Sequence, residues 1–213
     1  DDFLTPKAYN KISKIFPKNN AKIWKTPTNV HTVGKSVTKN GSLALKELSY
    51  SKDTRSFFHE LNSGLFLTFL EKLTGIKGLL PDPYFSESGF HRTSSGGYLD
   101  IHADFSHLNI LGLERRINLI FYLNENWQET YGGELGLYNE DLKKVVSVSP
   151  IANRMLIFST SDISFHGHPE RLSCPAKKYR KSIALYYYTM PTADRKKSSI
   201  LFPTDPKFTL KGS

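Results

Sequence analysis

Cysteine is almost absent from this sequence, and that absence sets the first limit on the protein. The 213 residues include one cysteine, Cys174, so no disulfide can form within the chain. Proteins without disulfides are typical of a reducing compartment, and we therefore expect a cytoplasmic location. Nothing near this lone cysteine suggests a nucleophile, so we expect it to be inert.

Long apolar runs, internal repeats and low-complexity stretches are also lacking. No run of about 18 apolar residues could span a membrane, and no signal-peptide pattern opens the chain. We therefore expect a soluble protein with no membrane partner. The chain begins at Asp1 rather than at methionine, from which we expect a trimmed N-terminus. Its length, with 38% hydrophobic and 13% aromatic residues, predicts one domain, 1–213, with a substantial core.

Acidic residues are the minority among the charged side chains. Lysine and arginine number 29 against 20 aspartates and glutamates, which gives a formal net charge of +9. Such a balance can mark a nucleic-acid or acidic partner. However, the basic residues are spread along the chain without an aromatic-interleaved recognition motif. A solvated lysine-rich surface is the favoured interpretation.

The first 80 residues carry helical patterns that predict a supporting unit. Thr5-Pro6 is a typical helix start, and Pro17 is expected to end that helix. Apolar residues at helical spacing between 51 and 75 predict one or two further helices, with Gly64 as a break and Gly75 as a C-cap. We expect all of these apolar residues in the core: Phe57, Phe58, Leu61, Leu65, Phe66, Phe69, Leu70 and Leu73.

From about residue 84 the pattern changes to short β-rich segments. These segments are separated by Gly, Pro, Asn and Ser, and they cover 117–124, 133–139, 143–150, 153–160 and 180–189. Several short strands at even spacing predict a sandwich or barrel over 84–190. A further strand is predicted near 21–26. Residues 191–213 are expected to form a tail that partly packs against the body.

Three side chains make a candidate metal site. His102 and Asp104 are two residues apart, so on a strand both point to the same side. His166 must be returned to them by the fold. Two neutral imidazoles and one carboxylate on one face of an iron ion leave three coordination positions open, as in non-haem Fe(II) oxygenases. A His-x-Asp pair alone is weak evidence for a metal site, because such a pair is more often an ordinary surface pair.

Another histidine competes for the third ligand position. His168 would share the face of His166 on a strand, but only one ligand position remains. The histidine that is not the ligand is expected to support the site or to face the substrate. The other histidines are expected to be surface or packing residues: His31, His59, His91 and His107.

The surroundings of these residues resemble the 2-oxoglutarate/Fe(II) oxygenases, in their prolyl-hydroxylase-like branch. The resemblance covers about residues 85–190, and the first 80 residues match only loosely. Its specific elements are Tyr-Leu-Asn-x-x-Trp at 122–127, Gly-Gly-x-Leu at 132–135, Asn-Arg at 153–154 and the arginine that opens 180–189. The resemblance implies a mainly β fold with flanking helices, a double-stranded β-helix of the jelly-roll or cupin-like type. The distance from Asn153-Arg154 in the family favours His166 over His168.

The resemblance also implies a co-substrate site. Arg180 aligns with the family's arginine, which holds the distal carboxylate of 2-oxoglutarate by two charge-assisted hydrogen bonds. Lys181 is the alternative, although it lies on the other face of the strand. Tyr122 aligns with a tyrosine that binds the same carboxylate, and Asn118 shares its face. At position 92 this chain has an arginine, whereas the family often has a tyrosine that lies near the keto acid.

The activity implied is Fe(II)- and 2-oxoglutarate-dependent oxidation by O2, with ascorbate as a candidate additional cofactor. His102, Asp104 and His166 would be the catalytic metal set. A peptide or protein substrate, most naturally hydroxylated at proline, is the first hypothesis, and a free amino acid or natural product is the alternative. Nucleic-acid demethylation ranks low, because that branch carries a second arginine where this chain has Tyr186. The intact metal set argues against a non-catalytic cupin-like binding module. The oligomeric state is left open.

Overall fold

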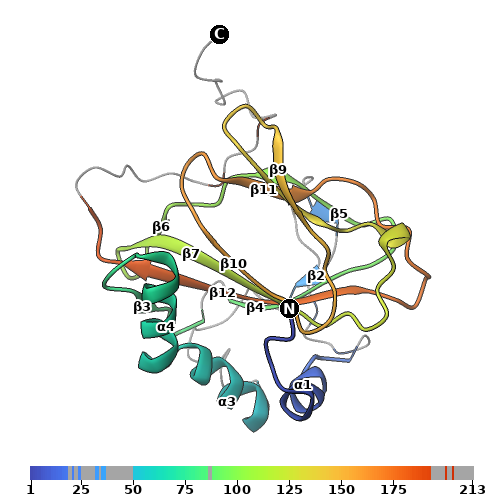
Figure 1. Cartoon of the computed structure of the whole chain (residues 1–213), viewed down its shortest axis with the longest axis horizontal. Helices are drawn as coiled ribbons and strands as arrows, with labels where there is room; N and C mark the ends of the chain where they lie inside the picture. The colour runs from blue at the N-terminus through green and yellow to red at the C-terminus, as the bar shows by residue number, and fades with distance from the viewer. Residues whose placement is uncertain are drawn as a thin grey trace.

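In its described residues, the computed structural model of the chain consists of two antiparallel sheets and three α-helices (Figure 1). The structure describes residues 1–18, 50–85 and 88–192, together with positions 21, 24, 32–33, 35–36, 200 and 203. The mainly β architecture with helices on one side confirms the predicted jelly-roll fold class. Of the strand predicted near 21–26, only positions 21 and 24 are described, and neither lies in a strand. Most of the predicted tail lies outside the described residues.

Along the chain, strands of one sheet are interspersed with strands of the other, so residues distant in sequence become neighbours. The larger sheet has the order β10 (Met155–Ser159), β7 (Leu113–Tyr122), β12 (Arg180–Thr189), β4 (Gly89–Thr93) and β2 (Lys35–Ser36). β3 (Leu80–Pro81) pairs with β12, and β6 (His107–Leu108) pairs with β7. The other sheet has the order β1 (Thr32–Val33), β5 (Tyr98–His102), β11 (Phe165–His168), β8 (Leu135–Tyr138) and β9 (Lys144–Val148).

Side-chain caps define where the three helices begin. The helices are α1 (Pro6–Ser13), α3 (Lys52–Leu61) and α4 (Gly64–Thr74). The hydroxyls of Thr5, Ser51 and Ser63 each accept a backbone N–H from the first turn. α4 ends at Gly75, whose φ of 75° is favourable for glycine. α1 ends at Ser13, earlier than the predicted limit at Pro17. Among the described residues, no helix is long and apolar enough to cross a membrane.

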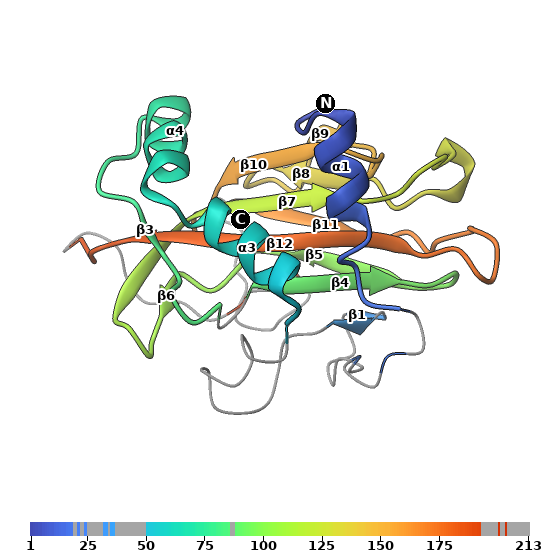
Figure 2. The same ribbon diagram turned by 90° about the horizontal axis from the view of Figure 1, so that it is seen from below.

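The main apolar core lies between the helices and the outer face of the larger sheet. Figure 2 shows α1 and α3 in front of the strands of the larger sheet, with α4 beside them at the upper left. Alternate residues of the two longest strands enter this core: Ile117, Leu119 and Phe121 from β7, and Ile183, Leu185 and Tyr187 from β12. The residues between them face the other way, toward the second sheet. The space between the sheets is therefore left for polar side chains.

The prediction that every apolar residue of α4 lies in the core was wrong. Leu65, Phe69 and Leu73 are 79%, 43% and 58% exposed, whereas Leu70 is fully buried. The three exposed residues are spaced by four and so form one stripe along the helix. A helix on the outside of a sheet buries only the stripe that faces the sheet. Spacing alone could not say which apolar stripe that would be.

Candidate active site

Three metal-binding side chains meet between the two sheets. His102 ends β5, and His166 on β11 is its direct antiparallel partner. Asp104 follows β5 by two residues. Its Oδ1 lies 3.7 Å from Nε2 of His102, and its Oδ2 lies 3.4 Å from Nε2 of His166. One donor atom from each residue falls within 4.8 Å of the others, which makes the cluster compact enough for one metal ion.

Both imidazoles are oriented by backbone carbonyls. Nδ1 of His102 lies 2.8 Å from the carbonyl oxygen of Asp100, and Nδ1 of His166 lies 3.4 Å from that of Ser164. A carbonyl oxygen only accepts, so each Nδ1 carries the proton and each Nε2 lone pair faces the cluster. Burial is the main reason that the pKa of His166 falls to about 4. The imidazole is therefore neutral, as a metal ligand must be.

The carboxylate of Asp104 is held from the opposite side. Its Oδ2 accepts hydrogen bonds from the Arg115 guanidinium at 2.9 Å and from the Asn118 amide at 2.7 Å. Nε of Arg115 also donates to Oδ1 of Asn118 at 2.9 Å. Burial by itself raises the pKa of Asp104, but the positive charge of Arg115 opposes this and holds the pKa well below its ordinary value. Asp104 is therefore an anion with one oxygen anchored by the protein.

Arg115 is a residue of this site that sequence reasoning missed. Under strict alternation it would share the core face of Ile117 on β7. The register between β7 and β12 shifts at this point, because Tyr187 pairs with Ile117 whereas Tyr188 pairs with Arg115. The extra residue turns Arg115 to the inner face, where its guanidinium stacks 3.7 Å from the Tyr186 ring. No sequence pattern marks this bulge.

Glycine at position 167 lets β11 approach β5 closely. A Cβ atom there would lie 2.7 Å from the carbonyl oxygen of Asp100. Any side chain would therefore push the strand that carries His166 away from the strand that carries His102. The glycine between the two histidines of the His-Gly-His segment is thus required for the metal cluster.

A second polar group lies around the predicted arginine. Arg180 opens β12 and is buried, with 6% exposure. Its Nε donates to the carbonyl of Gly133 at 2.6 Å, and one terminal nitrogen donates to the Tyr122 hydroxyl at 3.2 Å. Burial raises the pKa of Tyr122, although Arg180 opposes the shift. The phenol therefore keeps its proton, and both side chains can donate to a carboxylate.

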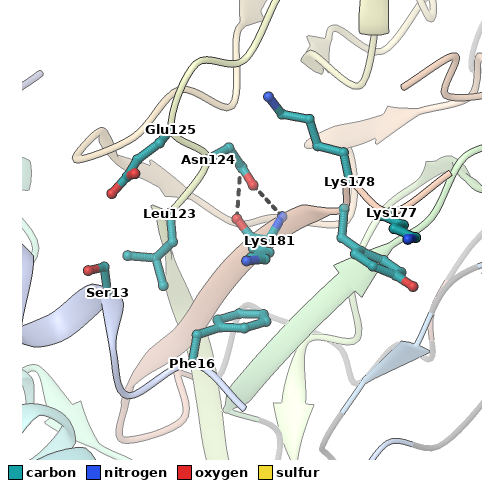
Figure 3. A pocket seen from close by; sticks show the side chains of 9 residues that line it. Ser13, Phe16, Leu123, Asn124, Glu125, Lys177, Lys178 and Lys181 are labelled. Atoms are coloured by element: carbon teal, nitrogen blue, oxygen red, sulfur yellow. Dashed lines mark hydrogen bonds between the residues drawn. The ribbon is translucent and has the colours of Figure 1, made fainter. Parts of the chain in front are cut away.

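The neighbouring lysine faces the other side of the sheet. Nζ of Lys181 lies over the Phe16 ring at 5.5 Å and lines an outer hollow of about 290 Å³ between α1 and β12 (Figure 3). Asn124 fixes this part of the chain. Its side chain accepts from the backbone N–H of Lys181 at 2.6 Å and donates to the backbone oxygen of Lys181 at 3.0 Å (Figure 3). Arg180, next in the strand, is thereby directed inward.

The Trp127 and Gly-Gly elements complete the support of Arg180. The Trp127 indole donates to the carbonyl of Gly132 at 3.0 Å. Gly133, the next residue, has a φ of +79°, and a Cβ there would lie 2.5 Å from Leu172 and 3.0 Å from Arg180. Only glycine therefore lets this loop reach the guanidinium. The Tyr-Leu-Asn-x-x-Trp and Gly-Gly segments together build one arginine cradle.

Other residues considered from the sequence lie elsewhere. Arg92 stacks between Trp24 and Tyr179, at 4.4 and 4.9 Å from their ring centres. Its strand partner is Lys181, so it lies on the outer face of the sheet and not beside the arginine cradle. His168 is buried but does not belong to the metal cluster. The structure thus brings His102, Asp104 and His166 together, and Arg180 and Tyr122 together.

The comparison with known families covers the whole of this site. Residues 88–188 match the sequence profile of the 2OG-Fe(II) oxygenase superfamily, and this range includes the metal cluster and the arginine cradle. Residues 88–188 are therefore similar to the 2OG-Fe(II) oxygenase superfamily. Fe(II) and 2-oxoglutarate, with O2, are therefore the metal and co-substrates of this fold. The residues present fit them: two neutral nitrogen donors and one carboxylate suit iron, and a buried guanidinium with a phenol suits a carboxylate.

Relatives of this oxygenase include prolyl hydroxylases. The chain is 38% identical over 79 residues to mouse (Mus musculus) prolyl 3-hydroxylase OGFOD1, a stretch that covers 35% of this chain and 14% of that protein. A Pseudomonas putida prolyl-4-hydroxylase structure matches with a TM-score of 0.61 at 15% identity, over 88% of this chain and 89% of that one. A prolyl hydroxylase from Trichoplax adhaerens, solved with a hypoxia inducible factor peptide, gives 0.59 at 18% identity, over 88% and 81%. At these identities the structural matches establish the fold.

Proposed function

We propose that this protein is an Fe(II)- and 2-oxoglutarate-dependent dioxygenase that hydroxylates a prolyl or other residue of a peptide or protein. The observation that carries the proposal is the pairing of a two-histidine, one-carboxylate cluster with a buried arginine and tyrosine in one space between the sheets. Neither group alone would suffice. A metal cluster without a carboxylate anchor could serve many chemistries, whereas both together fit a chelating keto acid.

Each side chain of the site has a definite part in this proposal. His102, Asp104 and His166 would hold Fe(II), and Arg180 with Tyr122 would bind the distal carboxylate of 2-oxoglutarate. When bound, these groups supply the oxidation of a substrate C–H bond by O2, with conversion of 2-oxoglutarate to succinate and CO2. Arg115 and Asn118 hold one oxygen of Asp104, which directs the other oxygen toward the metal position.

The substrate class is supported by the relatives. The mouse relative is a prolyl 3-hydroxylase, and the Trichoplax enzyme was solved with a hypoxia inducible factor peptide fragment. We propose a peptide or protein substrate for this chain on that basis. A cytoplasmic location is proposed from the single cysteine, which leaves the chain without an internal disulfide.

A peptide screen tests the proposal directly. The protein is incubated with Fe(II), 2-oxoglutarate, O2 and pools of proline-containing peptides, and succinate and the peptide masses are measured. We expect succinate release together with a mass gain of one oxygen atom on a peptide. Because the net charge is +9, turnover on an acidic peptide should fall as ionic strength rises. Succinate release with free amino acids or metabolites only, and without salt dependence, would establish a small-molecule oxygenase instead.

The metal ligands can be tested without turnover. Mn(II) binding, measured by calorimetry, should be lost in His102→Ala, Asp104→Ala and His166→Ala, because each change removes one of three ligands. His59→Ala is the matched control, since this exposed histidine of α3 lies outside the site. The control should bind Mn(II) like the unaltered protein. Unchanged affinity in the three ligand variants would show that the metal is held elsewhere.

Arg180 and Lys181 form a matched pair for the co-substrate. Arg180→Ala should weaken the binding of 2-oxoglutarate by about 2–4 kcal/mol, because a buried charge-assisted pair is lost. The apparent KM for 2-oxoglutarate should rise roughly 30- to 1000-fold. Lys181→Ala should leave the apparent KM nearly unchanged, since Lys181 faces the outer hollow (Figure 3). Equal effects of the two substitutions would contradict this assignment.

A further inference from the structure

His168 is a buried polar side chain with no part in the site described so far. It lies two residues after His166 on β11 and is 4% exposed. His166 pairs with His102 across the sheet. His168 pairs with Leu99, so the extra residue at this register shift lies on β5. β11 therefore keeps its alternation, and its two imidazoles lie on the same face.

One ring nitrogen of His168 has no partner within the protein. Its Nδ1 atom is buried and makes no hydrogen bond to any described residue. Native proteins satisfy nearly all buried polar atoms, and a bound ligand is one way to do so. The metal cluster does not use this nitrogen, because the compact set of donors consists of other residues.

The surroundings of His168 indicate what such a ligand would be. β11 pairs with β8 through Gly167 and Gly136, so His168 continues this pairing toward Gly133, whose carbonyl accepts a hydrogen bond from Arg180. The ring therefore lies on the side of β11 that carries His166, toward the arginine cradle. A keto acid that is anchored on Arg180 and reaches the metal ligands would pass beside it. A neutral imidazole has one N–H, and a carboxylate oxygen, which only accepts, selects the form with that proton on Nδ1.

We infer that His168 donates a hydrogen bond from Nδ1 to the distal carboxylate of 2-oxoglutarate, beside Arg180 and Tyr122. It is then a residue that selects dicarboxylic keto acids over monocarboxylic ones. This inference rests on the proposed function, since it places the co-substrate between the arginine cradle and the metal ligands. It adds a third donor that a resemblance in motifs does not supply.

Calorimetry on the Mn(II)-loaded protein, which does not turn over, tests the inference. The probes are 2-oxoglutarate and 2-oxopentanoate, which has the same keto-acid end and chain length but no distal carboxylate. His168→Leu should raise the dissociation constant of 2-oxoglutarate by about 10- to 100-fold, which is the effect of losing a hydrogen bond to a charged group. It should leave the affinity for 2-oxopentanoate unchanged. His168→Asn, which keeps an N–H near the position of Nδ1, should restore most of the affinity for 2-oxoglutarate.

Other results would overturn the inference. Equal weakening of both keto acids by His168→Leu would mean a packing role, and no weakening would mean no contact. A loss of Mn(II) affinity in the same variant would make His168 a metal ligand. If Arg180→Ala weakens 2-oxoglutarate but His168→Leu does not, the proposed function stands and only this inference fails. If the unaltered protein binds neither Mn(II) nor 2-oxoglutarate, both fail together.

Discussion

At the scale of single residues, the site depends on how one buried carboxylate is stabilised. Asp104 is 11% exposed at its side chain, and an isolated buried carboxylate would be strongly disfavoured. Arg115 supplies the compensating charge and Asn118 a neutral donor, both at the same oxygen. Arg115 is itself sandwiched between the rings of Tyr186 and Phe105, at 3.7 and 4.6 Å. Its position is thus fixed by packing as well as by charge.

Substitution of Asn118 tests this support. Asn118→Ala should raise the dissociation constant for Mn(II) by about 10- to 100-fold, because a ligand oxygen loses the donor that orients it. Calorimetry measures the effect. Asn139→Ala, which alters an exposed turn asparagine, is the control and should bind Mn(II) normally. An Asn118→Ala protein with full Mn(II) affinity would show that Arg115 alone orients Asp104.

At the scale of elements, the close approach of β5, β8 and β11 brings the metal ligands together. β11 lies between the other two strands, and its central residue, Gly167, pairs with Gly136 of β8. The two glycines differ in what a side chain would meet. A Cβ at Gly167 meets backbone atoms of β5 at 2.7 Å, whereas a Cβ at Gly136 meets the end of the Tyr138 ring at 2.7 Å. Backbone cannot move aside locally, but a tyrosine ring can rotate.

These two glycines give a matched pair of substitutions. Gly167→Ala should separate β11 from β5, lower the melting temperature and weaken Mn(II) binding, because His166 moves away from His102. Gly136→Ala should change both quantities much less, since the Tyr138 side chain can turn away. Thermal unfolding and Mn(II) calorimetry measure the two effects. Similar losses in both variants would mean that general crowding of the sheet, and not the approach of β5, limits the site.

At the scale of the whole molecule, apolar and polar interiors are separated by the larger sheet. The helices and the outer face of this sheet bury the main core, whereas its inner face carries the site. Hydrogen bonds also connect the N-terminal segment to a residue about 150 positions later in the chain. Asn153 accepts from the backbone N–H of Leu4 at 2.9 Å and donates to its carbonyl at 2.8 Å. Arg154 forms an ion pair with Asp1 nearby.

Asn153 should therefore contribute to global stability. Its φ is 59°, a conformation that glycine and asparagine tolerate best. Asn153→Gly should lower the free energy of unfolding by about 1–3 kcal/mol, through loss of the two hydrogen bonds. Asn153→Ala should lower the free energy of unfolding by about 1 kcal/mol more than Asn153→Gly, because alanine is strained at this φ. Urea unfolding of the metal-free protein measures both. Equal stability of the two variants would show that backbone strain does not contribute.

Much of the fold could be predicted because it depends on short-range patterns. The strands at 153–160 and 180–189 and the helix C-cap at Gly75 follow from alternation, helical spacing and turn chemistry. The spacing of His102 and Asp104 predicted side chains on one side of a strand. Asp104 instead follows the end of β5 by two residues, although the donor atoms still lie 3.7 Å apart. The exposed stripe of α4 could not be predicted, because it depends on which side of the helix meets the sheet.

The sequence by itself predicted a mainly β fold, a candidate metal set and opposite faces for Arg180 and Lys181, because alternation along a strand fixes which side chains share a face. The resemblance to a family supplied the jelly-roll class and the choice of Arg180. Only the tertiary structure decided the rest. A register shift of one residue turns Arg115 toward Asp104, and the placement of the other register shift on β5 leaves His168 on the same face of β11 as His166. Both depend on pairing between strands far apart in the chain. Such pairing is set by the packing of the whole sheet, and no local pattern in the sequence records it.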